Sequence, residues 1–249
     1  MEESGIKNES SVKNKLGWGP TAAIFVSISA YVFSQLVIVI PILLIKSLHT
    51  EKSESFISYV DNSSWASLLL AGFSAIGLLA FLYVFLKMRK KGFASLGFSR
   101  IRISHIGWLV LALVSYVILL MIAMSIAAMV PGFDSNQKQD VGFVSASGWQ
   151  LLLAFTGLVI IPPVAEEIVF RGFLYRGLAS KWPKILSALT TSLIFALLHF
   201  QWNVSLDVFI LSLVLIALFE KTKNLWMCVF LHGLKNFIAF ATIFLFATR

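Results

Sequence analysis

Charged residues are scarce in this chain of 249 residues. Asp, Glu, Lys and Arg make up only 13% of the sequence, whereas hydrophobic residues make up 58%. A soluble globular domain carries about 25% charged residues, so this composition excludes a soluble enzyme, a nucleic-acid module and a disordered chain. The mean hydropathy of +0.87 leads to the same exclusion. The composition is that of a membrane protein.

Cysteine is also nearly absent. Cys228 is the single cysteine, which excludes an internal disulfide and a cysteine-based zinc site. It lies in an apolar segment, and we interpret it as a packing residue. The sequence further lacks G-x-S-x-G, H-E-x-x-H, P-loop and G-x-G-x-x-G motifs. The chemistries that depend on those motifs are therefore set aside.

Long uncharged, apolar runs are what the sequence has in abundance. A helix needs about 20 such residues to cross the hydrocarbon core of a bilayer. The runs therefore predict an all-α polytopic transmembrane helix bundle with seven spans. They cover residues 21–45, 62–86, 106–133, 141–165, 185–206, 208–219 and 224–248, the last interrupted only by Lys235.

Basic residues are concentrated in alternate loops. The 87–105 loop contains six Lys and Arg residues and no acidic residue, and further basic residues lie in 171–184 and 220–224. Acidic residues outnumber basic ones in the 46–61 and 131–148 loops. Because short basic loops stay in the cytoplasm, we expect the N-terminus and the 87–105 loop inside and the 131–148 loop outside. The net charge of +8 is thus explained by topology and the lipid bilayer, with no nucleic-acid partner.

Ionisable residues inside the apolar runs form the candidate site. Such residues are costly in a bilayer and by default face a functional cavity. Three predicted helices each present one polar stripe, marked by a pair of residues at i,i+4 spacing on one helix face. The residues are Glu166, Glu167, Arg171, His199, His232 and Asn236, with Phe195 four positions before His199.

The depth of these residues predicts that they meet. Glu166 lies 16 residues before Trp182, and His199 lies 16 residues after Pro183. At 1.5 Å per residue, both sit roughly 24 Å from the turn at 182–183. We therefore expect Glu166, His199 and His232 to share an intramembrane cavity. We expect Asp207 to lie at the membrane interface. For Lys235 two positions remain open: its side chain either extends to the interface or lines the cavity.

Two chemistries fit this set of residues. A carboxylate beside an imidazole can deprotonate a water molecule, while His232 and Asn236 can stabilise an oxyanion. Alternatively, Glu166, His199 and His232 form a zinc site of two histidines and one glutamate with an open position for water. Both predict hydrolysis by activated water, and the choice between zinc and no cofactor stays open.

The motifs Glu166-Glu167-Ile-Val-Phe-Arg171, Phe195-Ala-Leu-Leu-His199 and His232-Gly-Leu-Lys-Asn236 occur in this order. The pattern resembles the CPBP family of intramembrane proteases, which comprises CAAX prenyl endopeptidases and bacterial Abi, or bacteriocin-processing, proteins. The resemblance covers roughly residues 148–245. Together with the predicted spans, it divides the chain into a polar tail (1–20), three N-terminal transmembrane helices (21–147) and a catalytic helical core (148–249). Prenyl endopeptidases of the family are described with eight helices, so eight spans are the alternative to the seven predicted here.

The resemblance implies an intramembrane endopeptidase, and the depth of the site residues places its cavity toward the cytoplasm. Glu166 would activate the attacking water and His199 would help to hold it. His232 and Asn236 would stabilise the oxyanion, while Glu167 and Arg171 would organise the site. Members of the family are commonly labelled metalloproteases. The compact length implies a bacterial plasma-membrane protein acting on a peptide or membrane-protein substrate.

Two other classes of function remain as alternatives. One is a non-catalytic bacteriocin-immunity or scaffold protein that binds a peptide or partner in the same cavity. The other is a proton-coupled transporter in which Glu166 and the histidines form a relay. A transporter would show repeated halves or broken helices, and we find no internal repeat.

Overall fold

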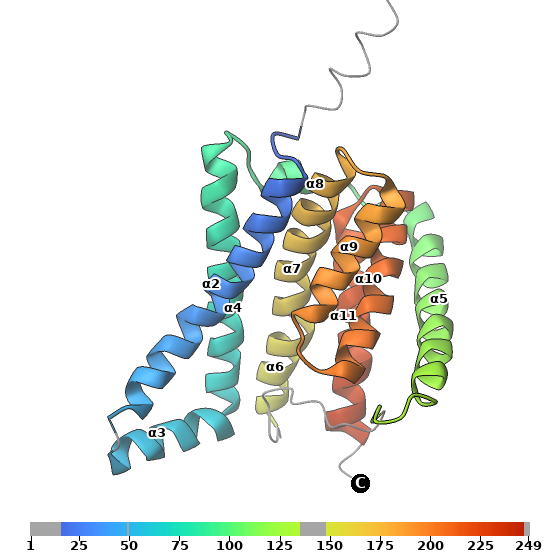
Figure 1. The fold of residues 1–249 in the computed structure, drawn as a ribbon. Helices are drawn as coiled ribbons and strands as arrows, with labels where there is room; N and C mark the ends of the chain where they lie inside the picture. Colours follow the sequence, from blue (N-terminus) through green and yellow to red (C-terminus); the bar gives the residue numbers. More distant parts are fainter. Residues whose placement is uncertain (1–15, 49, 135–147, 247–249) are drawn as a thin grey trace, which may run out of the picture.

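The computed structural model describes residues 16–48, 50–134 and 148–246 (Figure 1), and these residues form helices and no strand. The helices of the N-terminal half are α2 (Pro20–Lys46), α3 (Glu51–Asn62), α4 (Ser64–Met88) and α5 (Ser104–Ala127), with a 3₁₀ turn, η1 (Phe93–Leu96). Those of the C-terminal half are α6 (Gln150–Phe155), η2 (Thr156–Ile160), α7 (Ile161–Glu167), η3 (Ile168–Tyr175), α8 (Arg176–Ala179), α9 (Lys184–Leu197), α10 (Trp202–Thr222), α11 (Leu225–Ala241) and η4 (Thr242–Phe246).

Six helical stretches of the described chain are long and apolar enough to cross a membrane. They are α2, α4, α5, the continuous helix Gln150–Ala179 (α6 to α8), α10 and Leu225–Phe246. The prediction of an all-α polytopic bundle is confirmed. The fifth predicted span, 185–206, corresponds to α9, which is apolar but has only 14 residues. It rises about 21 Å, less than the roughly 30 Å of the hydrocarbon core.

The predicted boundary between the fifth and sixth spans is wrong. The sequence pattern places it at Asp207, whereas the chain turns at residues 198–201 and α10 already begins at Trp202. The turn carries no Asp, Glu, Lys or Arg, so the hydropathy pattern does not reveal it. Phe200 turns the chain there in a left-handed conformation, at φ 54°. His199 therefore lies in a turn and not on a helix.

Helix α3 is a second correction, because it fills most of the segment that the sequence analysis treats as the 46–61 loop. Thr50 and Ser53 cap it reciprocally: the Ser53 N–H donates to Thr50 Oγ1 at 3.1 Å, and the Thr50 N–H donates to Ser53 Oγ at 3.0 Å. The polar composition of α3 explains why a search for apolar runs did not find it.

The predictions for the tail up to residue 15 and for residues 135–147 lie outside the described residues.

The larger of two buried hydrophobic clusters joins the N-terminal helices to the C-terminal ones. The Trp18 indole donates to the Phe173 carbonyl at 3.1 Å and stacks on the Phe173 ring, with the ring centroids 4.8 Å apart. Gly177 permits the close contact of α8 with α2, because an added Cβ would lie 2.5 Å from the Ala23 Cβ. The helix 150–179 therefore runs through the centre of the bundle (Figure 1).

Candidate active site

Two consecutive prolines shape the long central helix. Neither Pro162 nor Pro163 has a backbone N–H, so the Leu158 carbonyl loses both the i+4 and the i+5 donor of its own helix. The helix widens to a π-helical turn at Thr156–Ile160, a deviation that often occurs at functional sites. The Asn236 side chain of α11 donates to the freed Leu158 carbonyl at 2.9 Å. The amide of Asn236 therefore ties α11 to the π-helical turn.

Gly233 brings α11 against the same turn. A Cβ at this position would lie 3.2 Å from the Val159 carbonyl oxygen, closer than most real contacts of a Cβ. The absence of a side chain thus sets the spacing between α11 and the central helix. This spacing brings His232, the preceding residue, to the carboxylates at the end of α7.

Glu167 is the centre of a buried ionic group. Its Oε1 accepts from Arg171 Nη1 at 2.7 Å and from His232 Nδ1 at 2.8 Å. The side chains of Glu167 and Arg171 are both fully buried. Since a buried charge is tolerated only when it is paired, the three side chains hold one another. Glu167 thereby fixes the proton of His232 on Nδ1 and leaves the Nε2 of the neutral ring with a lone pair.

The Phe195 ring is an apolar surface that both histidines contact. The Arg171 guanidinium carbon lies 4.7 Å from the Phe195 ring centroid, a cation–π contact. The rings of His199 and His232 meet the Phe195 ring edge to face, at centroid distances of 5.0 and 6.2 Å. Phe195 therefore packs against both imidazole rings.

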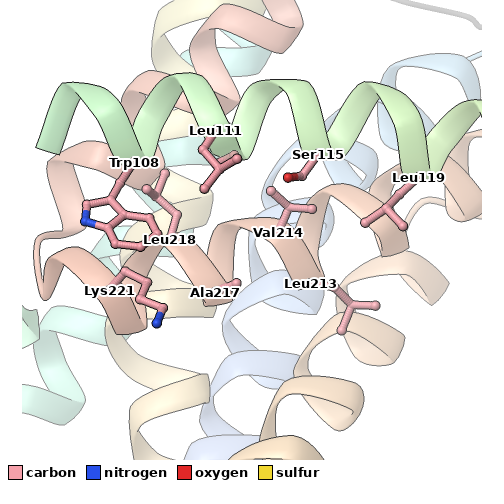
Figure 2. A pocket seen from close by; sticks show the side chains of 10 residues that line it. Trp108, Leu111, Ser115, Leu119, Leu213, Val214, Ala217, Leu218 and Lys221 are labelled. Atoms are coloured by element: carbon pink, nitrogen blue, oxygen red, sulfur yellow. The ribbon is translucent and has the colours of Figure 1, made fainter.

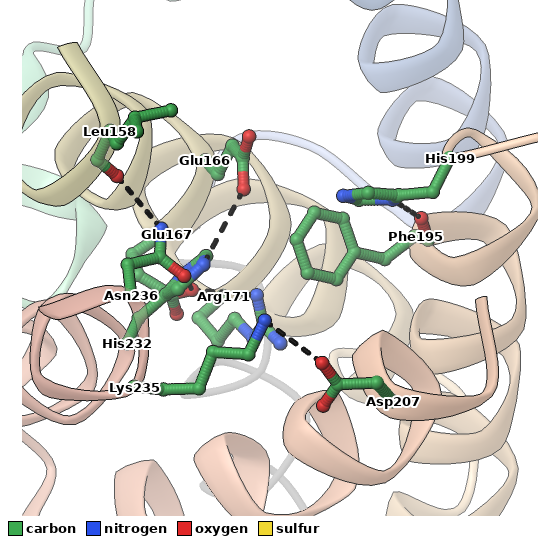
Figure 3. Close-up of polar contacts among 10 residues, drawn as sticks. All are labelled: Leu158, Glu166, Glu167, Arg171, Phe195, His199, Asp207, His232, Lys235 and Asn236. Atoms are coloured by element: carbon green, nitrogen blue, oxygen red, sulfur yellow. Dashed lines mark hydrogen bonds and ion pairs between the residues drawn. The ribbon is translucent and has the colours of Figure 1, made fainter. Parts of the chain in front are cut away.

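His199 is held by its own chain. Its Nδ1 lies 2.9 Å from the Phe195 carbonyl, and a carbonyl oxygen can only accept, so Nδ1 carries the proton. The free Nε2 points toward Glu166 (Figure 3). Tyr31 of α2 donates to the adjacent Leu198 carbonyl at 2.7 Å. This contact of Tyr31 with the turn at 198–201 was not predicted from the sequence.

Glu166 differs sharply from its neighbour Glu167. Its side chain is 22% exposed, whereas that of Glu167 is 0% exposed. Its Oε2 faces the His232 Nε2 at 3.8 Å, a distance that leaves the carboxylate room for another hydrogen-bond partner. Two adjacent carboxylates thus have two environments, one buried and neutralised and one open.

The structure also pairs two charges that the sequence analysis did not join. The Lys235 ammonium lies 2.9 Å from Asp207 Oδ2, and the Tyr116 hydroxyl donates to Asp207 Oδ1. These contacts connect α5, α10 and α11 within the bundle and lie beside the buried ionic group (Figure 3). Asp207 therefore has polar partners on two neighbouring helices.

The site contains side chains of the kinds that bind zinc, but they are not arranged as a zinc site. Two imidazole nitrogens with free lone pairs and one carboxylate are ligands that zinc accepts. Among the described residues, however, no group of three or more His, Cys, Asp or Glu side chains is arranged to hold a metal ion. The described residues therefore offer zinc-type donors without a preformed three-ligand site.

Comparison with known proteins gives one match. The family model described as "Type II CAAX prenyl endopeptidase Rce1-like" matches residues 148–238, which include the six candidate residues. No curated protein and no solved structure matches the chain. The helical bundle, its apolar spans and this match support one assignment. Through residues 148–238, the C-terminal helical core is similar to the CAAX-type intramembrane proteases of the CPBP family.

Proposed function

We propose that this protein hydrolyses a peptide bond of a peptide or membrane-protein substrate with a water molecule that Glu166 activates. The contrast between the two adjacent glutamates carries the proposal. Glu167 is buried and neutralised by Arg171, while Glu166 is open and faces an imidazole nitrogen. Neighbouring carboxylates in different environments are typical of a site in which one acts as the base and the other as the organiser.

In the proposed reaction, the water donates its hydrogen bonds to Glu166 and to the free Nε2 of His199. Glu166 takes one proton as the water oxygen attacks the carbonyl carbon, and the carbonyl electrons move to its oxygen. The proton then passes to the leaving nitrogen as the C–N bond breaks. The products are one carboxylic acid and one amine, and Glu166 is returned as a carboxylate.

His232 is proposed to act on the oxyanion. In its neutral form the Nε2 lone pair cannot donate a hydrogen bond. The proposal therefore assigns His232 its imidazolium form throughout the reaction, with Nδ1–H donating to Glu167 and Nε2–H donating to the oxyanion. We assign Asn236 first to positioning, because its amide already binds the Leu158 carbonyl.

The first prediction concerns metal. Purified protein in proteoliposomes should cleave its substrate at the same rate after treatment with a strong zinc chelator, since the described residues form no three-ligand site. Reaction in heavy-oxygen water should place the label in the new carboxyl group of the product. Loss of activity on chelation and its recovery with added zinc would show instead that a metal holds the water.

We also propose an orientation, and the second prediction tests it. The N-terminal end of α2 lies at one end of the bundle (Figure 1), and the same end carries the basic segments 87–103, 180–184 and 221–223. By the positive-inside rule this end is cytoplasmic. Cysteine at Ala94 should react with a membrane-impermeant maleimide only after lysis, whereas cysteine at Met129, at the other end, should react in intact cells. The native Cys228 is buried and gives little background. The reverse labelling pattern would refute the orientation.

A further inference from the structure

A groove of about 290 Å³ lies between α5 and α10 (Figure 2). Apolar side chains form most of its wall, including Leu111 and Leu119 from α5 and Leu213 and Ala217 from α10. Leu111 and Leu119 are exposed on the outer surface of the bundle. In a membrane this groove therefore faces the lipid.

The length of the groove along α5 matches the thickness of one bilayer leaflet. Trp108 lies one turn into α5, and Lys221 lies in the last turn of α10, at the end of the bundle where the basic segments gather. Leu119 marks the other end of the groove, 11 residues beyond Trp108. That separation corresponds to about 16 Å along α5, roughly half of a hydrocarbon core of about 30 Å. Tryptophan and lysine at this level match the headgroup region.

The charge at the mouth of the groove is available to an anion. The Lys221 ammonium lies 5.3 Å from the centroid of the Trp108 ring, and it forms no ion pair with a carboxylate of the described residues. Lys223, two residues on, differs because it shares Glu220 with Lys184. Arg100 and Arg102, exposed in the loop before α5, add positive charge at the same end.

We propose that this groove binds one acyl chain of an anionic phospholipid, with the lipid phosphate on Lys221. The apolar wall accommodates the chain through one leaflet, and the unpaired cation above it selects the headgroup charge. Trp108 lies beside Lys221 at the headgroup level. The site is separate from the candidate active site and does not depend on peptide hydrolysis.

Native mass spectrometry of the full chain in detergent, with added phosphatidylglycerol or phosphatidylcholine, tests the site. Lys221→Gln should weaken phosphatidylglycerol binding about five-fold, the effect of one basic residue at a membrane surface, and should leave phosphatidylcholine binding unchanged. Lys223→Gln is the matched control, because it removes the same charge from a cation already paired with Glu220. Equal losses of phosphatidylglycerol binding in the two variants would show that the lipid responds only to the overall positive charge at this end of the bundle. That result would overturn the proposal.

A second variant tests the acyl chain. Ala217→Phe fills the groove from an exposed position without changing the net charge, and should reduce phosphatidylglycerol binding as strongly as Lys221→Gln. Unchanged binding in Ala217→Phe, or displacement of the lipid by inorganic phosphate alone, would show that only a surface anion site exists. Thermal unfolding of each variant checks that the fold is kept.

Discussion

Glu166→Gln is expected to lower the rate of peptide-bond hydrolysis by at least ~100-fold, the usual scale for removal of a general base. The substitution keeps the size of the side chain and its capacity for hydrogen bonding, but the amide cannot take a proton from water. Because Glu166 is partly exposed and forms no short hydrogen bond, the thermal stability should stay close to that of the unsubstituted protein. Turnover in proteoliposomes and thermal unfolding measure the two quantities.

Cys228→Ser is the matched control for a covalent mechanism. The thiol is fully buried and lies 3.3 Å from the Leu215 carbonyl, so it has no access to a substrate. Turnover should be nearly unchanged in this variant. Full activity of Glu166→Gln would defeat water activation by this carboxylate and would favour the alternative of a peptide-binding immunity or scaffold protein.

The second large effect is expected from the charge pair Asp207–Lys235. Asp207→Leu leaves the Lys235 ammonium without its partner inside the bundle and deprives the Tyr116 hydroxyl of its acceptor. Breaking a buried ion pair on one side costs about 3–5 kcal/mol. We expect about 3 kcal/mol, at the lower end of this range, because the Asp207 side chain is 21% exposed. Reversible unfolding in mixed micelles measures the loss.

The control for this prediction removes all three polar groups together. Asp207→Leu combined with Lys235→Met and Tyr116→Phe leaves no unpaired charge, and replacement of a buried pair by apolar residues is often neutral. The triple variant should therefore recover most of the stability lost in Asp207→Leu. A triple variant as unstable as the single one would mean that the ion pair is not the cause.

The polar pairs of the candidate site could be predicted because they are local. Four-residue spacing places His232 and Asn236 on one face of α11, and Glu167 and Arg171 on one face of the central helix. The sequence did not reveal which side chain meets which. His232 binds Glu167 and Asn236 binds the Leu158 carbonyl, and these contacts depend on Gly233 and on two prolines that free that carbonyl.

The membrane spans could be predicted from composition, but not all of their ends. Hydropathy locates α2 and α4 within two residues at each end, because polar or charged segments flank both. It misses the turn at 198–201, where the chain reverses without a charge, and it ends a span at Asp207, whose charge has partners in other helices. Both errors concern tertiary contacts that a sequence pattern does not contain.

Comparison of peptide termini in the membranes of cells that carry the unsubstituted protein or Glu166→Gln tests the central claim most directly. If Glu166 activates the hydrolytic water, a defined set of new termini should be present with the unsubstituted protein and absent with Glu166→Gln, while the uncut precursors accumulate. His232→Ala should give the same loss, and Lys223→Gln, far from the site, should not. An identical set of termini in the two kinds of cells would contradict the assignment of Glu166 as the base of an intramembrane protease.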